Sequence, residues 1–106
     1  MNNEEFKSVV DEVVVKCKKI LDKKGPNYSS DGNRFDNFDA AAAMKRQTPQ
    51  QALLGMSVKH TVSIHDFVDR SADHEFITKK EWEAKIFDEI NYCFLLYGML
   101  RRDGSV

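Results

Sequence analysis

The chain has 106 residues, enough for one domain that buries roughly 65% of its unfolded surface and needs no disulfide or structural metal. Sixteen basic and seventeen acidic residues give a net charge of −1, so the excess positive charge of a nonspecific nucleic-acid binder is missing. The longest apolar run, Cys93–Leu100, is far below the roughly 20 residues that span a bilayer. We therefore expect a single cytoplasmic domain, residues 1–106, with no membrane contact and no charge-based support for nucleic-acid binding.

The N-terminal segment predicts an amphipathic helix from about Asn3 to Lys23. Apolar residues recur at steps of three and four between Phe6 and Leu21, with glutamates in the first turn and lysines at the end, as the helix dipole favours. Gly25-Pro26 follows and is predicted to end this helix.

A loop rich in turn formers, residues 25–33, leads into a predicted short helix through Phe35, Phe38 and Ala40–Ala43. Thr48 with Pro49 then forms a helix start, because Gln51 completes a capping box. A third helix of about twenty residues is expected from there, fading in the polar stretch 69–73. Its apolar seam is predicted to consist of Leu53, Met56, Ile64 and Phe67.

The clearest helix start is at Thr78, where Glu81 completes a second capping box and a helix is predicted to run to Arg102. One sector of this helix is predicted to face the core: Trp82, Ile86, Ile90, Cys93, Tyr97 and Leu100. Its second half is apolar all round, through Phe94, Leu95, Leu96 and Met99, which indicates a central position or a contact with another subunit. The fold class is therefore all-α, a small helical bundle of about four helices, and we expect a homo-oligomer.

The two cysteines, Cys17 and Cys93, lie in apolar runs without CxxC or Cys/His spacing. This pattern favours reduced core residues over a disulfide or a zinc site. The three histidines are scattered and have no cysteine partners, which also disfavours zinc.

His60 falls among the seam residues of the third helix, so its imidazole is predicted to point inward. One interpretation is a core histidine satisfied by a single hydrogen bond. The other is that His60 and Lys59 line a cavity between helices and meet an anionic group such as phosphate.

Asp88 and Glu89 are the second candidate pair, because Glu89 projects near the apolar sector, where an unpaired carboxylate is costly. An ordinary ion pair would satisfy the carboxylate of Glu89, and so would exposure to water at the edge of the apolar sector. A divalent cation with oxygen ligands would do so too.

The loop and its exit are the third candidate. The amides of a Gly/Ser/Asn loop that enters a helix suit an anion, to which Arg34 adds charge, and Tyr28 or Phe35 could stack on a base. The alternative is a plain connector with Phe35 and Phe38 in the core. The spacing matches neither a P-loop nor GxGxxG.

Several short motifs together resemble small phage and prophage proteins that are similar to the MazG-like, all-α nucleoside triphosphate pyrophosphohydrolases. The resemblance covers roughly residues 24–100. It implies dimers or tetramers of helical bundles, in which carboxylates on two helices hold magnesium for attack by water between the α and β phosphates. The motifs are Asn27-Tyr28, Asn33–Phe38, Thr48-Pro49, Ala52–Met56, Val58–His60 and Asp88–Tyr92.

Two acidic motifs of that group are incomplete in this chain. EExxE is absent, because Glu4-Glu5 is followed by Ser8 where the third acid would fall, and ExxD has Lys85 in place of its glutamate before Asp88. Fewer acids imply weaker magnesium binding. A pocket for nucleotides can persist without hydrolysis.

The first hypothesis is a MazG-like protein that binds a nucleotide or related phosphate compound, with Mg²⁺ and pyrophosphohydrolysis as its enzymatic version. In this hypothesis Lys59, His60 and Arg34 meet phosphate, Asp88 and Glu89 bind the metal, and Tyr28 or Phe35 contacts the base. The alternative is a noncatalytic phage accessory or anti-defence protein that binds a host or phage protein, or its own copies, through a helical surface. A helical accessory protein with no ligand is the third possibility.

Overall fold

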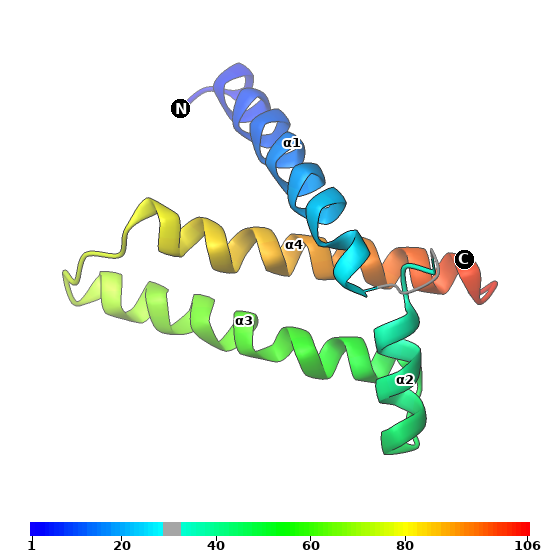
Figure 1. Ribbon diagram of the computed structural model, residues 1–106. Helices are drawn as coiled ribbons and strands as arrows, with labels where there is room; N and C mark the ends of the chain where they lie inside the picture. Colours follow the sequence, from blue (N-terminus) through cyan, green and yellow to red (C-terminus); the bar gives the residue numbers. More distant parts are fainter. Residues whose placement is uncertain (29–32) are drawn as a thin grey trace.

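The computed structural model describes residues 1–28 and 33–106, which form four helices (Figure 1). They are α1 (Asn3–Tyr28), α2 (Asp36–Lys45), α3 (Pro49–Ala72) and α4 (Lys79–Arg102). The all-α prediction is confirmed for the described part of the chain. None of its helices is long and apolar enough to cross a membrane.

Helices α3 and α4 form an antiparallel hairpin, and both begin at the capping boxes that the sequence predicts (Figure 1). The hydroxyl of Thr48 accepts from the amide of Gln51, and the hydroxyl of Thr78 accepts from the amide of Glu81, each over 3.1 Å. Each glutamine or glutamate side chain in turn accepts from the backbone amide of its threonine. Each capping box thus satisfies two backbone amides at the start of its helix through contacts within four residues of the chain.

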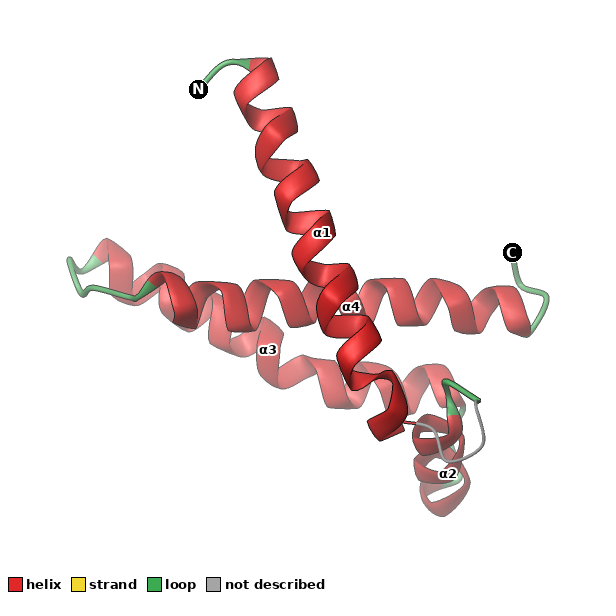
Figure 2. Cartoon of the chain, turned by 45° about the horizontal axis from the view of Figure 1, so that its top comes forward, coloured by secondary structure: helices red, strands yellow, loops and turns green. Residues whose placement is uncertain are grey.

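Helix α1 crosses α4 and rests on it only through its C-terminal half (Figure 2). At the crossing Cys17 is fully buried, and the side-chain amide of Asn91 donates to its backbone carbonyl over 3.2 Å. The N-terminal half of α1 rises away from the α3–α4 hairpin, and residues 1–12 are all exposed.

The main core lies where α2, α3 and α4 meet. Its buried members are Phe38, Leu53, Leu95 and Met99, with Leu21 and Phe35 among the side chains packed around them. Gly98 permits the close approach of Phe35, whose Cζ would be only 3.3 Å from a Cβ at that position. Phe35 and Phe38 thus take part in packing, in agreement with the connector interpretation of their segment.

Helix α1 does not end at Gly25-Pro26, so the predicted end near Lys23 is wrong. Gly25 is buried against the guanidinium of Arg34, which donates from Nη1 to the carbonyl of Leu21 over 2.9 Å. This tertiary contact supports the last turn, where proline supplies no amide hydrogen. Helix α3 ends at Ala72, inside the polar stretch 69–73 where the sequence predicts its end.

The predicted inward sector of α4 is wrong at three of its six positions, while Trp82, Ile90 and Leu100 are half-buried. The buried face runs through Phe87, Asn91, Leu95 and Met99, whereas Ile86, Cys93 and Tyr97 of the predicted sector are exposed. Cys17 is a buried free cysteine as predicted, but Cys93 is not a core residue. On α3, Leu53 and Phe67 are buried and Met56 is not. The buried face of α4 contains a polar residue, Asn91. A helical wheel that ranks faces by hydrophobicity therefore does not identify this face as the buried one.

Two methionines give a matched test of the core. Met99 is fully buried and Met44 is 86% exposed. We expect Met99→Ala to lower the free energy of unfolding by about 2–5 kcal/mol, because it leaves a cavity, and Met44→Ala to change it by less than about 0.5 kcal/mol. Chemical denaturation of both variants measures the difference. Equal effects would contradict the described core.

Candidate functional site

Asp88 is the centre of a polar cluster where α1, α3 and α4 meet. One carboxylate oxygen lies 3.3 Å from the ammonium of Lys24 on α1, and the other lies 3.7 Å from Nε2 of His60 on α3. Asp88 is partly buried and His60 is only 6% exposed, so these charges are partly shielded from water. Electrostatic interactions are stronger in such surroundings than at an open surface.

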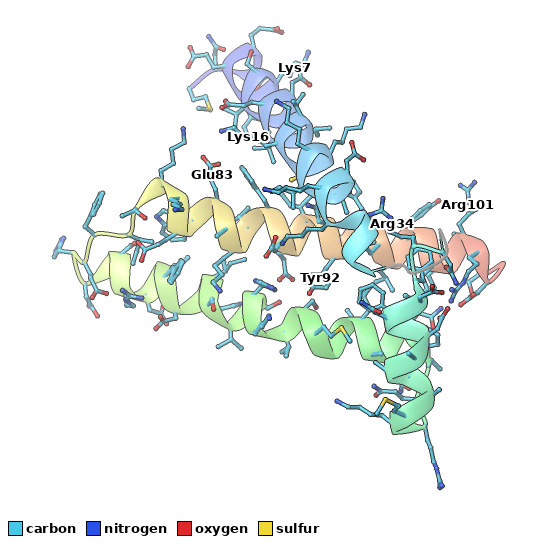
Figure 3. The ribbon with its side chains drawn as sticks, in the orientation of Figure 1. Lys7, Lys16, Arg34, Glu83, Tyr92 and Arg101 are labelled. Atoms are coloured by element: carbon cyan, nitrogen blue, oxygen red, sulfur yellow. The ribbon has the colours of Figure 1, made fainter. Side chains whose placement is uncertain are left out.

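His60 is a buried histidine whose surroundings favour the neutral form. Burial lowers its pKa below the ordinary value of 6.5, and the nearby charge of Asp88 opposes that shift only in part. The ring of His60 lies 5.5 Å from that of Tyr92, centroid to centroid. Tyr92 extends from α4 toward α3 (Figure 3). Its Nδ1 is buried without a hydrogen-bond partner among the described residues. The predicted inward orientation is confirmed, but the single hydrogen bond expected for a core histidine is not found.

A second polar contact lies beside the cluster. The hydroxyl of Thr61 donates to the carboxylate of Glu89, 2.8 and 2.9 Å from its two oxygens. Asn91 donates to Cys17, while its Oδ1 is buried and has no hydrogen-bond partner within the described ranges. Glu89 therefore has an ordinary neutral partner. The cluster retains two buried polar atoms, one on His60 and one on Asn91, that a ligand or water can satisfy.

A cleft opens along α1 and α4 beside Asp88. Its inner part is narrow and lined by Ile20, Leu21, Lys24, Asp88, Asn91, Tyr92 and Leu95. A wider pocket of about 410 Å³ adjoins it and adds Lys23 and Ala84 to the lining. The wider pocket has the size of a small-molecule site, and its cationic groups are both on α1.

The predicted site residues are only partly brought together. His60, Asp88 and Glu89 cluster, and Lys59 is exposed on the next position of α3. The guanidinium of Arg34 is bonded to the end of α1. Phe35 packs against the core under Arg102, whose guanidinium carbon lies 5.1 Å from the ring centroid. The side chain of Tyr28 lies outside the described residues.

Asp88 and Glu89 do not form a metal site by themselves. Within residues 1–28 and 33–106 no three histidine, cysteine, aspartate or glutamate residues lie close enough to hold a metal ion. Asp88 already faces Lys24 and His60, and Glu89 faces Thr61. A magnesium ion there needs further oxygen ligands, such as phosphates and water, and stays a prediction.

Lys24, Asn91 and Tyr92 belong to the site but were missed by the sequence reasoning. Asn91 and Tyr92 stand three and four positions after Asp88, which places all three on neighbouring parts of one helix surface. That spacing could have identified them. Lys24 could not be identified, because α1 was predicted to end before it.

Comparison of the chain with known protein families, with characterised proteins and with solved structures finds no match. The resemblance to MazG-like proteins therefore stays a prediction that depends on the short motifs alone. The functional proposal depends on the geometry around Asp88.

The neutral state of His60 predicts a pH-dependent stability. The unfolded chain binds a proton at this histidine near pH 6.5, whereas the folded chain resists it, so stability is present at neutral pH and is lost as the pH falls. We expect the melting temperature to drop by a few degrees less in His60→Gln than in the wild type between about pH 7 and pH 5. Calorimetry in metal-free buffer measures this.

The exposed histidine His65 supplies the control. His65→Gln should keep the pH dependence of the wild type. A His60→Gln variant that loses stability on acidification as steeply as His65→Gln would contradict a neutral, buried His60.

Proposed function

We propose that this chain is a cytoplasmic protein that binds a nucleotide or related phosphate compound in the cleft between α1 and α4. The observation that supports this most strongly is the pair of lysines, Lys23 and Lys24, that line the wider pocket beside the His60–Asp88–Lys24 cluster. Lysine side chains bind phosphate as point charges. The buried Nδ1 of His60, a residue that lines neither part of the cleft, has no hydrogen-bond partner among the described residues.

The pocket walls suggest how such a ligand lies. Lys23 and Lys24 line the wider part of the cleft and can meet the phosphates. Ile20, Leu21 and the ring of Tyr92 line the inner part, whose volume of about 30 Å³ is that of a single water molecule, so the apolar face of a base would lie in the wider part against Ile20 and Ala84. Lys59 and Arg34, which line neither part of the cleft, stay in the proposal as additional cations.

The enzymatic version of this proposal adds Mg²⁺ at Asp88 and Glu89 and pyrophosphohydrolysis as in MazG-like proteins. Support for it is limited to two neighbouring carboxylates and the short motifs. Magnesium would be held largely by the phosphates of the ligand, because the described residues offer few oxygen ligands.

Thermal-shift measurements with ATP and the other nucleoside triphosphates, with and without Mg²⁺, test binding. A ligand that binds the folded state raises the melting temperature by mass action. We expect Lys24→Met to weaken binding about tenfold through the loss of a charge-assisted contact. Lys18→Met, at an exposed position of the same helix outside the pocket lining, should bind like the wild type.

Three outcomes are decisive for this proposal. No shift with any triphosphate rejects it, and so does equal binding by the two lysine variants. Release of pyrophosphate no greater than that of Asp88→Ala rejects hydrolysis alone.

A second candidate function, a noncatalytic interaction protein, is favoured by exposed apolar side chains on α4. Phe94 and Tyr97 are exposed in the half of α4 for which a subunit or partner contact is predicted, while Leu95 and Met99 face inward. A host or phage protein, or another copy of the chain, would bind this surface. Loss of association in Tyr97→Glu, but not in Phe76→Glu at an exposed loop position, would support it.

A further inference from the structure

The N-terminal half of α1, residues 3–15, projects from the molecule and carries an uncovered apolar stripe; we name this segment the arm. Phe6, Val10 and Val13 lie on the stripe, with Phe6 59% and Val10 43% exposed. The same stripe continues to Cys17 and Leu21, where α4 and the core cover it. Of these five positions on one continuous face, Cys17 and Leu21 are thus the two covered within one chain.

A groove lies in the angle between α1 and the N-terminal half of α4. It has a volume of about 640 Å³, with a floor of Ile20, Ala84 and Phe87. Lysines stand along its rim, and Lys16 of α1 faces Glu83 of α4 across it over 3.5 Å (Figure 3). The lysines that line the groove are Lys16, Lys19, Lys79 and Lys80.

The arm and the groove have opposite charges. The arm carries four carboxylates and one lysine, whereas residues 16–24 of the same helix carry five lysines and one aspartate. Within the described part of the chain, Glu5 and Asp11 form no ion pair, and neither do Lys19 and Lys80 in the groove. An acidic, apolar helix is thus matched by a basic groove with an apolar floor.

The surface of the chain is large for its mass. It exposes 7559 Å², about 1,500 Å² more than a folded monomer of 12.2 kDa is expected to expose. Its radius of gyration is 16.0 Å, against about 13 Å for a compact domain of this length. A standard interface buries about 800 Å² per partner, so the excess is sufficient for a stable dimer.

We propose that two copies of the chain form a symmetric dimer, in which the arm of each copy lies in the α1–α4 groove of the other. The two α1 helices then run antiparallel, because this orientation places the acidic half of one helix beside the basic half of the other. The arm, about 20 Å long at 1.5 Å per residue, reaches along the groove and places Glu5 and Asp11 near the lysine rim. This dimer goes beyond the proposed ligand binding and is tested without ligand, since its groove shares Ile20 and Ala84 with the wider ligand pocket.

Two valines on opposite sides of the arm test the apolar part of the contact. Val10 is on the stripe and Val15 is on the other face, and they are 43% and 51% exposed. We expect Val10→Glu to weaken dimerisation at least about tenfold and Val15→Glu to leave it unchanged. Sedimentation at micromolar concentration measures the mass, and circular dichroism verifies that both variants fold.

Charge reversal tests the pairing of arm and groove. Lys19→Glu with Lys80→Glu gives a chain whose arm and groove are both acidic, and Glu5→Lys with Asp11→Lys gives one whose arm and groove are both basic. Each variant alone should be monomeric. A mixture of the two should form dimers, because each arm then meets a groove of opposite charge.

Several results would overturn the inference. These are a monomeric wild type at micromolar concentration, equal behaviour of Val10→Glu and Val15→Glu, and a mixture of charge variants that stays monomeric. A dimer that survives Val10→Glu and is lost in Tyr97→Glu also overturns it, in favour of the α4 surface. Nucleotide binding has a separate readout, so its failure leaves this test intact.

Discussion

The crossing of α1 over α4 is the contact on which the rest of the structure depends. Cys17 and Asn91 meet there with both side chains buried, and the side chain of Asn91 hydrogen-bonds to the α1 backbone. If α1 and α4 slid along each other, the buried amide of Asn91 would lose this partner. The hydrogen bond therefore fixes the register of the two helices. Lys24 reaches Asp88 only because of that register, and the arm projects because the contacts with α4 lie in the C-terminal half of α1.

Local signals in the sequence predicted where α3 and α4 begin. Tertiary contacts determine the end of α1 and the buried face of α4, which these signals did not predict. The capping boxes at Thr48 and Thr78 are satisfied within a few residues, so the sequence alone indicates them. The end of α1 depends on Arg34, which comes from beyond the following loop. The buried face of α4 includes Asn91, whose partner is on another helix. Such contacts leave no periodic signal in the sequence.

The candidate site also combines a feature that the sequence of one helix predicts with contacts that depend on the packing of several helices. His60 was predicted to point inward from its own helix, and it does so. Its neighbours Asp88 and Tyr92 come from α4, and Lys24, which pairs with Asp88, comes from α1; packing brings them together. Burial then lowers the pKa of His60, while the charge of Asp88 opposes the shift. The neutral imidazole is thus a product of the assembled fold, which single-helix patterns do not describe.

Because α1 is attached through its C-terminal half, it can act as a lever. A small rotation about Cys17 moves Phe6, eleven positions away, roughly one and a half times as far as Lys24, seven positions away, because displacement grows with distance from the pivot. A ligand that separates Lys24 from Asp88 would act at the short end, and a second copy that holds the arm would act at the long end. If the ligand and the second copy prefer different orientations of α1, each changes the affinity of the chain for the other. By thermodynamic linkage the two changes are the same factor.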